Sequence, residues 1–498
     1  MKRLLILLIL LVSMTTTAQD HVSVTMIMSR DPITLDPQGP IDPSAPVLLA
    51  YLYDTLVFQD EHGMIQPHLA QDWAVDGTTV TFNLRDDVVF SNGAPLNADS
   101  VIFTFQRLQE IGQRSFIYSE IMNISEFEKV DDYTVRFHLR QPSVTLLSAL
   151  TYTYAAILEP GAVESAGENY GMNPVGSGPF MLAEWTPQSS LSLVRNPNYA
   201  GHRPTDDPEI DGNIQQINIR FTNDQASRIN ALLSGEADIA YISSPPQLER
   251  LADNPDFTVM DDPTRGLVIL GFNMARPPFN ELTMRQAVAQ AIDKQLVLDI
   301  AAEGMGIVVN TPIAPSIFGY NPELEAEALP YDPNSALELV DNANYDGEPV
   351  VLLTSSFPTY QTMATVVQAQ LEAIGIESEI QVLDSAGLRQ AASEGAYDII
   401  LTRYDWNDPD LLRIYLGTDS RANRYGYSNP DLDALTAQGR AEFDPDARYQ
   451  IYTEAQRIVM ADLPWVPLHM AITKVIIRSD IQHSGLLYSH ILLEDAVR

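Results

Sequence analysis

The alternation of strand-like and helix-like segments in the C-terminal half of the chain constrains its fold more than any other feature. Short apolar runs of strand length are separated by segments whose apolar residues recur at helical spacing. In chain order the predicted strand, helix, strand, helix and strand occupy residues 350–353, 360–374, 376–383, 388–392 and 397–402. This order predicts an α/β fold with a parallel, doubly wound sheet.

An earlier part of the chain shows the same alternation. Residues 214–221 and 237–241 have strand patterns, and between them Asp224 begins and Gly235 ends an amphipathic helix. A chain of 498 residues also exceeds the size of one ordinary hydrophobic core. Two such series therefore predict two lobes with a cleft between them, and the half-buried strands within residues 51–171 predict a small additional α+β unit.

The N-terminus has the composition of a signal peptide. Lys2 and Arg3 precede an apolar run, residues 4–12, that is too short to span a bilayer, and small residues follow up to Ala18. We expect residues 1–18 to be removed and the protein to be exported to the periplasm or the extracellular space. Retention of the apolar run as a weak anchor is the alternative.

The absence of cysteine limits the chemistry available to the chain. With no cysteine in the sequence, there are no disulfides, no thiolate nucleophiles and no thiolate metal ligands. A lipid-modified N-terminal cysteine is excluded as well, so we do not expect a lipoprotein.

The charge balance argues against a nucleic-acid partner. Sixty-six acidic residues against 29 basic ones give a net charge of -37, which repels phosphate backbones and anionic lipid. Solubility, or a saline habitat, explains this acidity better than an acidic binding face does.

A polar and aromatic stretch directly follows the predicted strand 397–402. It contains Arg403, Tyr404, Asp405 and Trp406. Two aromatic side chains, a cation and an anion at the carboxyl end of a buried strand are what a ligand pocket in an open α/β sheet requires. The stretch is therefore the first candidate for a binding site.

The three carboxylates of this region differ in their local sequence. Asp408 precedes Pro409 and an apolar pair, which predicts a helix N-cap followed by proline at the first helical position. Asp410 then falls in the first helical turn, where a negative charge favours the helix dipole. Asp405 has no such structural explanation, so we favour it as the ligand-binding carboxylate.

Motifs for catalysis and metal binding are weak or missing. The eight histidines form no H-E-x-x-H motif, and the sequence contains neither the aspartic-protease triplets nor G-x-S-x-G. We expect no catalytic residue, no metal site and no cofactor. A secreted hydrolase that uses carboxylates in the cleft remains the alternative from another class, because chance pairs of carboxylates are common in so acidic a chain.

Several short motifs extend along the mature chain in a fixed order. They are Leu69-Ala70-Gln71-Asp72-Trp73, Thr81-Phe82-Asn83-Leu84-Arg85-Asp86-Asp87-Val88-Val89-Phe90-Ser91-Asn92-Gly93, Ala98-Asp99-Ser100-Val101, Gly176-Ser177-Gly178-Pro179-Phe180, Arg195-Asn196-Pro197-Asn198-Tyr199, Gly271-Phe272-Asn273 and Ala291-Ile292-Asp293-Lys294. In order and spacing they resemble the extracytoplasmic solute-binding proteins of ABC transporters, in the peptide/nickel (dipeptide- and oligopeptide-binding) family. Most of these residues identify the fold and not the ligand.

The resemblance implies a two-lobed periplasmic-binding-protein fold of the large, cluster C type with an extra α+β domain. Lobe I is expected from residues 19–50, 172–265 and 478–498, domain II from 51–171, and lobe III from 266–477. A ligand is enclosed between lobes I and III by hinge closure and is delivered to the permease subunits in the membrane. We expect a monomer.

The resemblance also bears on the ligand. In peptide-binding members an Asp after a lobe III strand pairs with the peptide α-amino group, and Asp405 matches it. Dipeptide-binding relatives carry an Arg for the carboxylate in the loop that aligns with residues 353–361, and this loop has no cation here. Its aromatic residues Phe357 and Tyr360 complete the expected ligand-binding set. We expect a peptide or another amine-bearing solute; sugars and metal complexes are the alternatives within the family.

Overall fold

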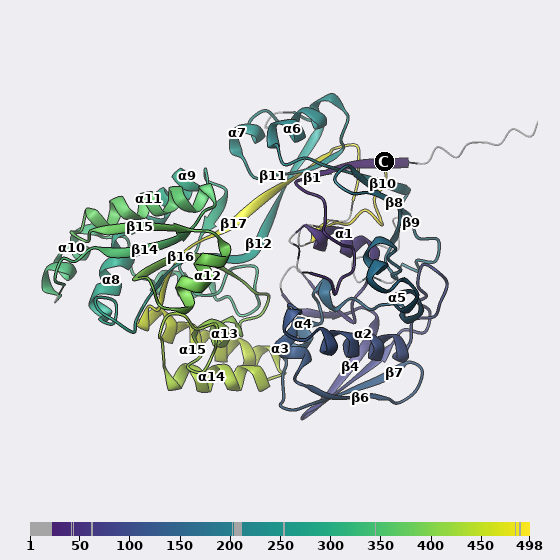
Figure 1. Cartoon of the computed structure of the whole chain (residues 1–498), viewed down its shortest axis with the longest axis horizontal. Coiled ribbons are helices and arrows are strands. Elements are labelled where there is room, and N and C mark those ends of the chain that lie inside the picture. Colours follow the sequence, from purple (N-terminus) through teal and green to yellow (C-terminus); the bar gives the residue numbers. More distant parts are fainter. Residues whose placement is uncertain are drawn as a thin grey trace, which may run out of the picture.

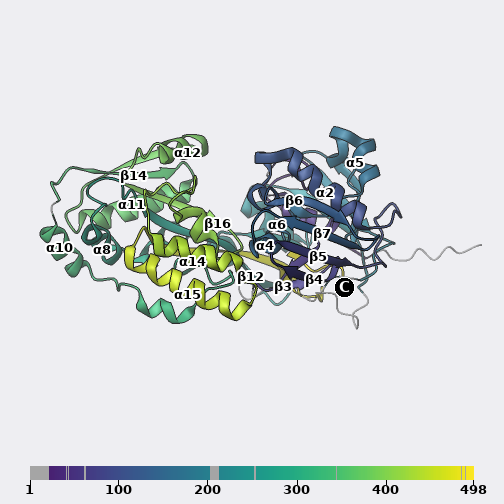
Figure 2. The same cartoon turned by 90° about the horizontal axis from the view of Figure 1, so that it is seen from below.

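The computed structural model describes residues 22–498, except residues 41, 43, 61–62, 202, 204–211, 252–253, 344, 484 and 488–489. The predicted signal peptide lies outside the described residues. Two bodies lie side by side in both views (Figure 1 and Figure 2): lobe III on the left, and lobe I with domain II on the right. None of the helices in the described part is long and apolar enough to cross a membrane.

One mixed sheet of eleven strands extends through both lobes. Its order is β15-β14-β16-β12-β17-β11-β1-β10-β9-β8, and β13 pairs with β17. The strands are β1 (Val22–Met28), β8 (Phe180–Thr186), β9 (Ser190–Arg195), β10 (Ile214–Phe221), β11 (Ile239–Ile242), β12 (Phe257–Phe272), β13 (Gly306–Val308), β14 (Val350–Ser355), β15 (Ser378–Leu383), β16 (Ile399–Asp405) and β17 (Trp465–Arg478).

The predicted parallel order holds within each lobe but not for the whole sheet. Strand β1 is parallel to β10 and β11, and β14 is parallel to β15 and β16, as the two α/β series predict. Strands β12 and β17 are antiparallel to each other and to their outer neighbours β16 and β11. The parallel order predicted for the α/β series is thus confirmed within each lobe, and the sheet as a whole is mixed because these two long strands pass between the lobes in opposite directions.

Strands β12 and β17 join lobe I to lobe III (Figure 1). Their first pairs, from Phe257 to Pro263 on β12, lie beside β11 of lobe I, and the last part of β12 pairs with β16 of lobe III. Between these two parts the register shifts: residues 264–266 of β12 face the single residue Ala471 of β17. Such an irregularity interrupts the ladder and bends the strand at the passage between the lobes.

Helices cover both faces of the sheet in lobe III. One face packs against α8 (Leu282–Ala291), α9 (Lys294–Ala301), α10 (Pro333–Asn342) and α11 (Pro358–Glu372). The other face packs against α12 (Ser385–Ser393), α13 (Leu411–Leu416), α14 (Pro430–Ala441) and α15 (Pro445–Asp462). The carboxyl ends of the parallel strands β14 and β16 therefore meet the first turns of helices from both layers, where crevices form in such sheets.

Lobe I and domain II each have their own apolar core. In lobe I the sheet packs on α1 (Ala45–Leu52) and on α5 (Pro160–Ala166) on one face, and on α6 (Gln225–Ser234) and α7 (Pro245–Leu248) on the other. Helix α5 lies within the residues expected for domain II, but its buried side chains belong to the core of lobe I. Domain II has a four-stranded antiparallel sheet of β4 (Ala70–Asp76), β5 (Thr79–Leu84), β7 (Thr134–Leu139) and β6 (Ile124–Lys129), with helices α2 (Ala98–Ile111), α3 (Tyr118–Ile121) and α4 (Thr145–Ala149). Two short hairpins, β2 (Val57–Gln59) with β3 (Ile65–Pro67) and β18 (Leu486–Leu487) with β19 (His490–Ile491), complete the strands of the described chain.

The buried His469 of β17 makes the fold sensitive to mild acid. Its ring is 1% exposed, and burial lowers its pKa from 6.5 to about 4. Between these two pKa values the unfolded chain binds a proton that the folded chain does not, so stability falls as the pH falls from 6.5 towards 4. Lowering the pH from 7 to 4.5 should reduce the unfolding free energy of both proteins. We expect this reduction to be about 2–3 kcal/mol smaller in His469→Gln than in the natural protein.

Urea unfolding of both proteins at the two pH values measures this difference. The carboxylates titrate alike in both proteins, so they cancel in the comparison. Equal losses would contradict the assignment of the acid sensitivity to His469.

Candidate functional site

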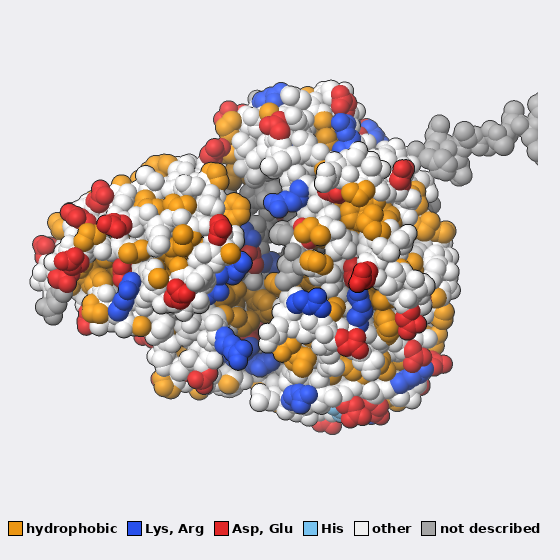
Figure 3. Space-filling model, viewed as in Figure 1, with side chains coloured by type: hydrophobic (Ala, Val, Ile, Leu, Met, Phe, Trp, Pro, Cys, Tyr) orange, Lys and Arg blue, Asp and Glu red, His pale blue; other side chains and the backbone are white. Residues whose placement is uncertain are grey.

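A cavity of about 680 Å³ lies between the two lobes. Its lobe III wall comes from the carboxyl ends of β14 and β16, the first turns of α11 and α12, and the loop that precedes α14. Arg30, which follows β1, contributes from lobe I. Figure 3 shows the hollow between the lobes, with Lys and Arg side chains gathered along both of its sides.

Strand β16 places two of the predicted site residues on one face. The strand continues to Asp405 and does not end at residue 402 as predicted, because β12 pairs with it as far as Gly266 opposite Asp405. Alternate residues of a strand point to the same face, so Arg403 and Asp405 lie together. Arg403 Nη2 lies 2.6 Å from Asp405 Oδ2, and Arg403 Nε donates to the same oxygen at 2.8 Å.

The second oxygen of Asp405 lies over Gly266 of β12. Both contacts with Arg403 use Oδ2, and Oδ1 has no hydrogen-bond partner among the described residues; the side chain is 47% exposed. A Cβ atom at position 266 would lie against Oδ1, 2.7 Å from the carbonyl oxygen of Tyr404 and 3.0 Å from Arg403 Nε. A glycine opposite Asp405 is thus required for the ion pair to lie over β12.

Tyr404 and Trp406 point away from this pair. Tyr404 is 3% exposed, and its hydroxyl donates to the Pro312 carbonyl at 2.5 Å, so it belongs to the lobe III core and borders the cavity from within. Trp406 is half-buried and packs against Phe116 and Tyr152 of domain II, with ring centroids 5.5 and 6.0 Å away. It lies at the contact between lobe III and domain II and does not line the cavity.

The two aromatic residues predicted from the loop 353–361 do line the cavity. Phe357 and Tyr360 lie at the start of α11, where Phe357 is 60% exposed and Tyr360 is half-buried. An apolar ring this exposed beside a cavity offers a stacking surface to a ligand. The structure thus brings together Arg403, Tyr404, Phe357 and Tyr360 at one cavity, with Asp405 adjoining through Arg403.

Asp408 and Asp410 are structural, but only partly in the predicted way. Helix α13 begins at Leu411 with Asp410 at the N-cap position, so the predicted helix start is two residues too early. The Asp408 side chain does accept a hydrogen bond from the Asp410 backbone N–H at 2.9 Å, as a capping residue would. Asp408 is also buried between lobe III and domain II, where it accepts hydrogen bonds of 2.6 Å from Arg448 and from Ser148. Burial raises the pKa of Asp410 to about 6.

Several polar residues of the cavity were missed by the sequence reasoning. They are Arg30, Ser355, Ser385, Arg389, Thr402 and Arg424. Ser355 closes the strand β14, which is a position where a polar residue is a useful signal. The three arginines come from segments far apart in the chain, and no local pattern distinguishes them.

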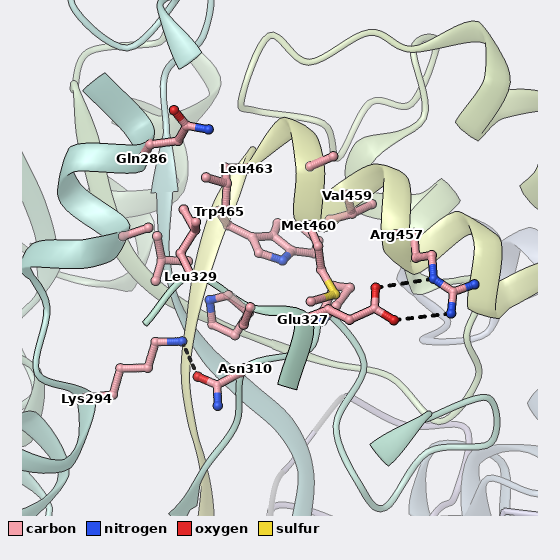
Figure 4. Close-up of a pocket in the computed structure, with 16 residues that line it drawn as sticks. Gln286, Lys294, Asn310, Glu327, Leu329, Arg457, Val459, Met460, Leu463 and Trp465 are labelled. Atoms are coloured by element: carbon pink, nitrogen blue, oxygen red, sulfur yellow. Dashed lines mark hydrogen bonds and ion pairs between the residues drawn. The ribbon is translucent and has the colours of Figure 1, made fainter. Parts of the chain in front are cut away.

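A second cavity, of about 270 Å³, lies within lobe III (Figure 4). Lys294 Nζ donates to Asn310 Oδ1 at 2.7 Å, and burial lowers the pKa of this lysine to about 8. The ion pair of Glu327 with Arg457 borders the cavity. Because every lining residue belongs to lobe III, a ligand there would not contact both lobes. No group of three His, Asp or Glu side chains that could hold a metal ion occurs in the described ranges.

Comparisons with known proteins agree with this two-lobed architecture. The family described as bacterial extracellular solute-binding proteins, family 5 Middle, matches residues 64–424. A probable D,D-dipeptide-binding periplasmic protein of Escherichia coli is 28% identical over 462 residues, covering 88% of this chain and 87% of the relative. A glutathione-binding protein of Salmonella typhi is 29% identical over 455 residues, covering 87% and 86%.

A solved structure shows the same fold. The ABC transporter-associated periplasmic binding protein of Helicobacter pylori, in complex with a peptide, matches with a TM-score of 0.76 at 24% identity, over 95% of this chain and 97% of that chain. The predicted two-lobed periplasmic-binding-protein fold is confirmed.

The different burial of Asp405 and Asp408 predicts different effects of the same substitution on stability. The pair of Asp405 with Arg403 is partly exposed and contributes about 0–1 kcal/mol, so Asp405→Asn should leave the unfolding free energy nearly unchanged. Asp408→Asn leaves Arg448 buried without its counter-charge, which should cost about 3 kcal/mol or more.

Urea unfolding of the two variants side by side tests this contrast. A large loss of stability in Asp405→Asn would make that carboxylate structural. A negligible loss in Asp408→Asn would contradict the role of its buried ion pair.

Proposed function

The chain belongs to family 5 of the bacterial extracellular solute-binding proteins, and from that premise we propose that it captures a peptide or another amine-bearing solute between lobes I and III. It delivers this solute to the permease subunits of an ABC importer. The relatives named as D,D-dipeptide-binding and glutathione-binding support a ligand of the peptide class. Export with removal of residues 1–18, a periplasmic or extracellular location and a monomeric state belong to the same proposal.

The observation that carries the proposal is the position of the cavity. Its lining comes from lobe III and, through Arg30 alone, from lobe I, and β12 and β17 join the two lobes. A ligand that contacts both walls binds the closed arrangement better than the open one, and this difference in affinity drives closure. A site inside one lobe, such as the cavity beside Lys294, lacks this property.

Asp405 is the proposed partner of the solute's amine. Its side chain is 47% exposed and only Oδ2 is held by Arg403, so the carboxylate can accept a hydrogen bond from an ammonium group without breaking the existing ion pair. The hydrolase alternative has no comparable support. The family is one of solute-binding proteins, and no Asp or Glu lines the cavity in the part of the chain that the structure describes.

Asp405→Asn should weaken the binding of a peptide with a free α-amino group by about ten- to hundredfold. The charge-assisted hydrogen bond that it removes contributes roughly 1.5–3 kcal/mol. Titration calorimetry with a peptide chosen from a thermal-shift screen measures the loss. The N-acetylated form of that peptide should bind equally weakly to both proteins.

The matched control is Asp419→Asn, which changes an exposed carboxylate of lobe III that has no ion pair among the described residues. It should bind the free peptide as the natural protein does. Unchanged affinity in Asp405→Asn would remove this residue from the site, and turnover of the peptide would contradict the carrier function.

Ligand binding should also compact the molecule. Small-angle X-ray scattering should give a smaller radius of gyration with saturating ligand than without it, because the ligand stabilises the closed arrangement of the two lobes. Equal radii in the two states would argue against hinge closure.

A further inference from the structure

We propose that the solute is anionic, with at least two carboxylate or phosphate groups, and that four arginines of the cavity between the lobes bind them. The four cavity arginines are Arg30, Arg389, Arg403 and Arg424. This inference rests on the proposed function, and it adds the charge of the solute. An acidic peptide is the class that satisfies both the amine at Asp405 and the anions at the arginines.

Three of the four cavity arginines form no ion pair among the described residues, a property they share with Arg114, Arg140 and Arg421 elsewhere in the chain. Acidic residues outnumber basic ones by more than two to one, and carboxylates pair with many of the other arginines. Yet no carboxylate pairs with Arg30, Arg389 or Arg424 within the described ranges, and none lines their cavity. Like charges that share a cavity repel each other, so an arrangement of this kind is stabilised when an anion enters.

The number of charges indicates how many anionic groups the solute carries. Four guanidinium groups line the cavity, and Asp405 is the one carboxylate that adjoins it through an ion pair. An excess of three positive charges remains, and the solute's amine adds to it. A single carboxylate leaves most of this charge uncompensated and two compensate half of it, whereas three carboxylates or two phosphate groups bring the closed cavity close to neutrality.

The lobe III wall also offers hydrogen-bond donors beside the arginines. Ser355 is 7% exposed, lines the cavity, and its hydroxyl has no hydrogen-bond partner in the described structure. Next to it begins the 15-residue helix α11, which has no side-chain N-cap and no acidic residue in its first turn. A buried hydroxyl and a helix N-terminus without a cap both donate to an anion.

The position of Arg30 in lobe I suggests how a bound anion would favour closure of the two lobes. It follows β1 of lobe I, whereas the other three arginines belong to lobe III. An anionic group bound on the lobe III wall attracts Arg30 from the opposite side, so the charge of the solute itself favours the closed state.

Titration calorimetry with the full mature chain and two tripeptides of nearly equal shape tests the proposal. Ala-Glu-Glu and Ala-Gln-Gln both carry the amine, and only the first carries side-chain carboxylates. We expect Ala-Glu-Glu to bind at least tenfold more tightly, and we expect added salt to weaken its binding more. Equal affinities for the two peptides would overturn the inference, even if Asp405→Asn weakened both and so supported the capture of amines.

Substitution of the arginines locates the effect. Arg389→Gln and Arg424→Gln should each weaken Ala-Glu-Glu by about ten- to hundredfold and should change Ala-Gln-Gln little. The matched control is Arg421→Gln, an exposed arginine three positions from Arg424 that does not line the cavity. Equal losses for both peptides, or a loss in the Arg421 variant of the same size, would overturn the assignment to the cavity arginines.

A third pair of probes separates this inference from the proposed function. Glutarate carries two carboxylates and no amine, whereas O-phosphoserine carries a phosphate group together with an amine. Binding of glutarate in the absence of any peptide binding would support the anion site and contradict the capture of peptides. Preference for O-phosphoserine over the acidic peptide would identify phosphate as the anionic group. Failure of every anionic probe to bind would overturn the inference.

Discussion

The hydrogen-bonded pair of strands β12 and β17 is the constraint on which the rest of the structure depends. These strands belong to the sheets of both lobes at once, so neither lobe can form its central pairing without the other. Their ladder is interrupted where residues 264–266 face Ala471 alone, at the passage between the lobes. A pair of strands with fewer hydrogen bonds between them at one point can bend there, while the packed sheets on either side keep their shape. The same strand β12 then fixes β16, and with it the position of the Arg403–Asp405 pair.

Burial, and not residue type, separates the roles of the carboxylates that follow β16. Asp405 is partly exposed and pairs with a partly exposed arginine, so replacing its charge should cost little stability. Asp408, three residues later, is enclosed by Arg448 and Ser148 and holds lobe III against domain II. The neighbouring Asn407 donates to the Ser148 carbonyl, and Trp406 packs on domain II aromatics. The residues directly beyond Asp405 thus stabilise the contact that supports the site.

The sequence was sufficient to predict the elements whose signals are local. The helix between Asp224 and Gly235 and the strands of both α/β series could be predicted because periodicity and caps depend on neighbouring residues. The extension of β16 to Asp405 could not, since it depends on β12, which lies more than a hundred residues earlier. The burial of Tyr404 follows from that extension, because alternate residues of a strand face opposite sides. Arg30, Arg389 and Arg424 could not be predicted for a related reason: only the folded chain brings them to one cavity.

The charge of the whole molecule and the charge of its cleft act over different distances. A net charge of -37 repels an anion far from the surface, but salt screens this repulsion beyond about 8 Å at physiological ionic strength. Inside the cavity the distances to the guanidinium groups are shorter than this, and the low-dielectric walls strengthen their attraction. The acidic surface therefore slows the approach of an anionic solute more than it weakens the bound state. An acidic exterior, suited to solubility, is for this reason compatible with the proposed binding of an anion in a basic cleft.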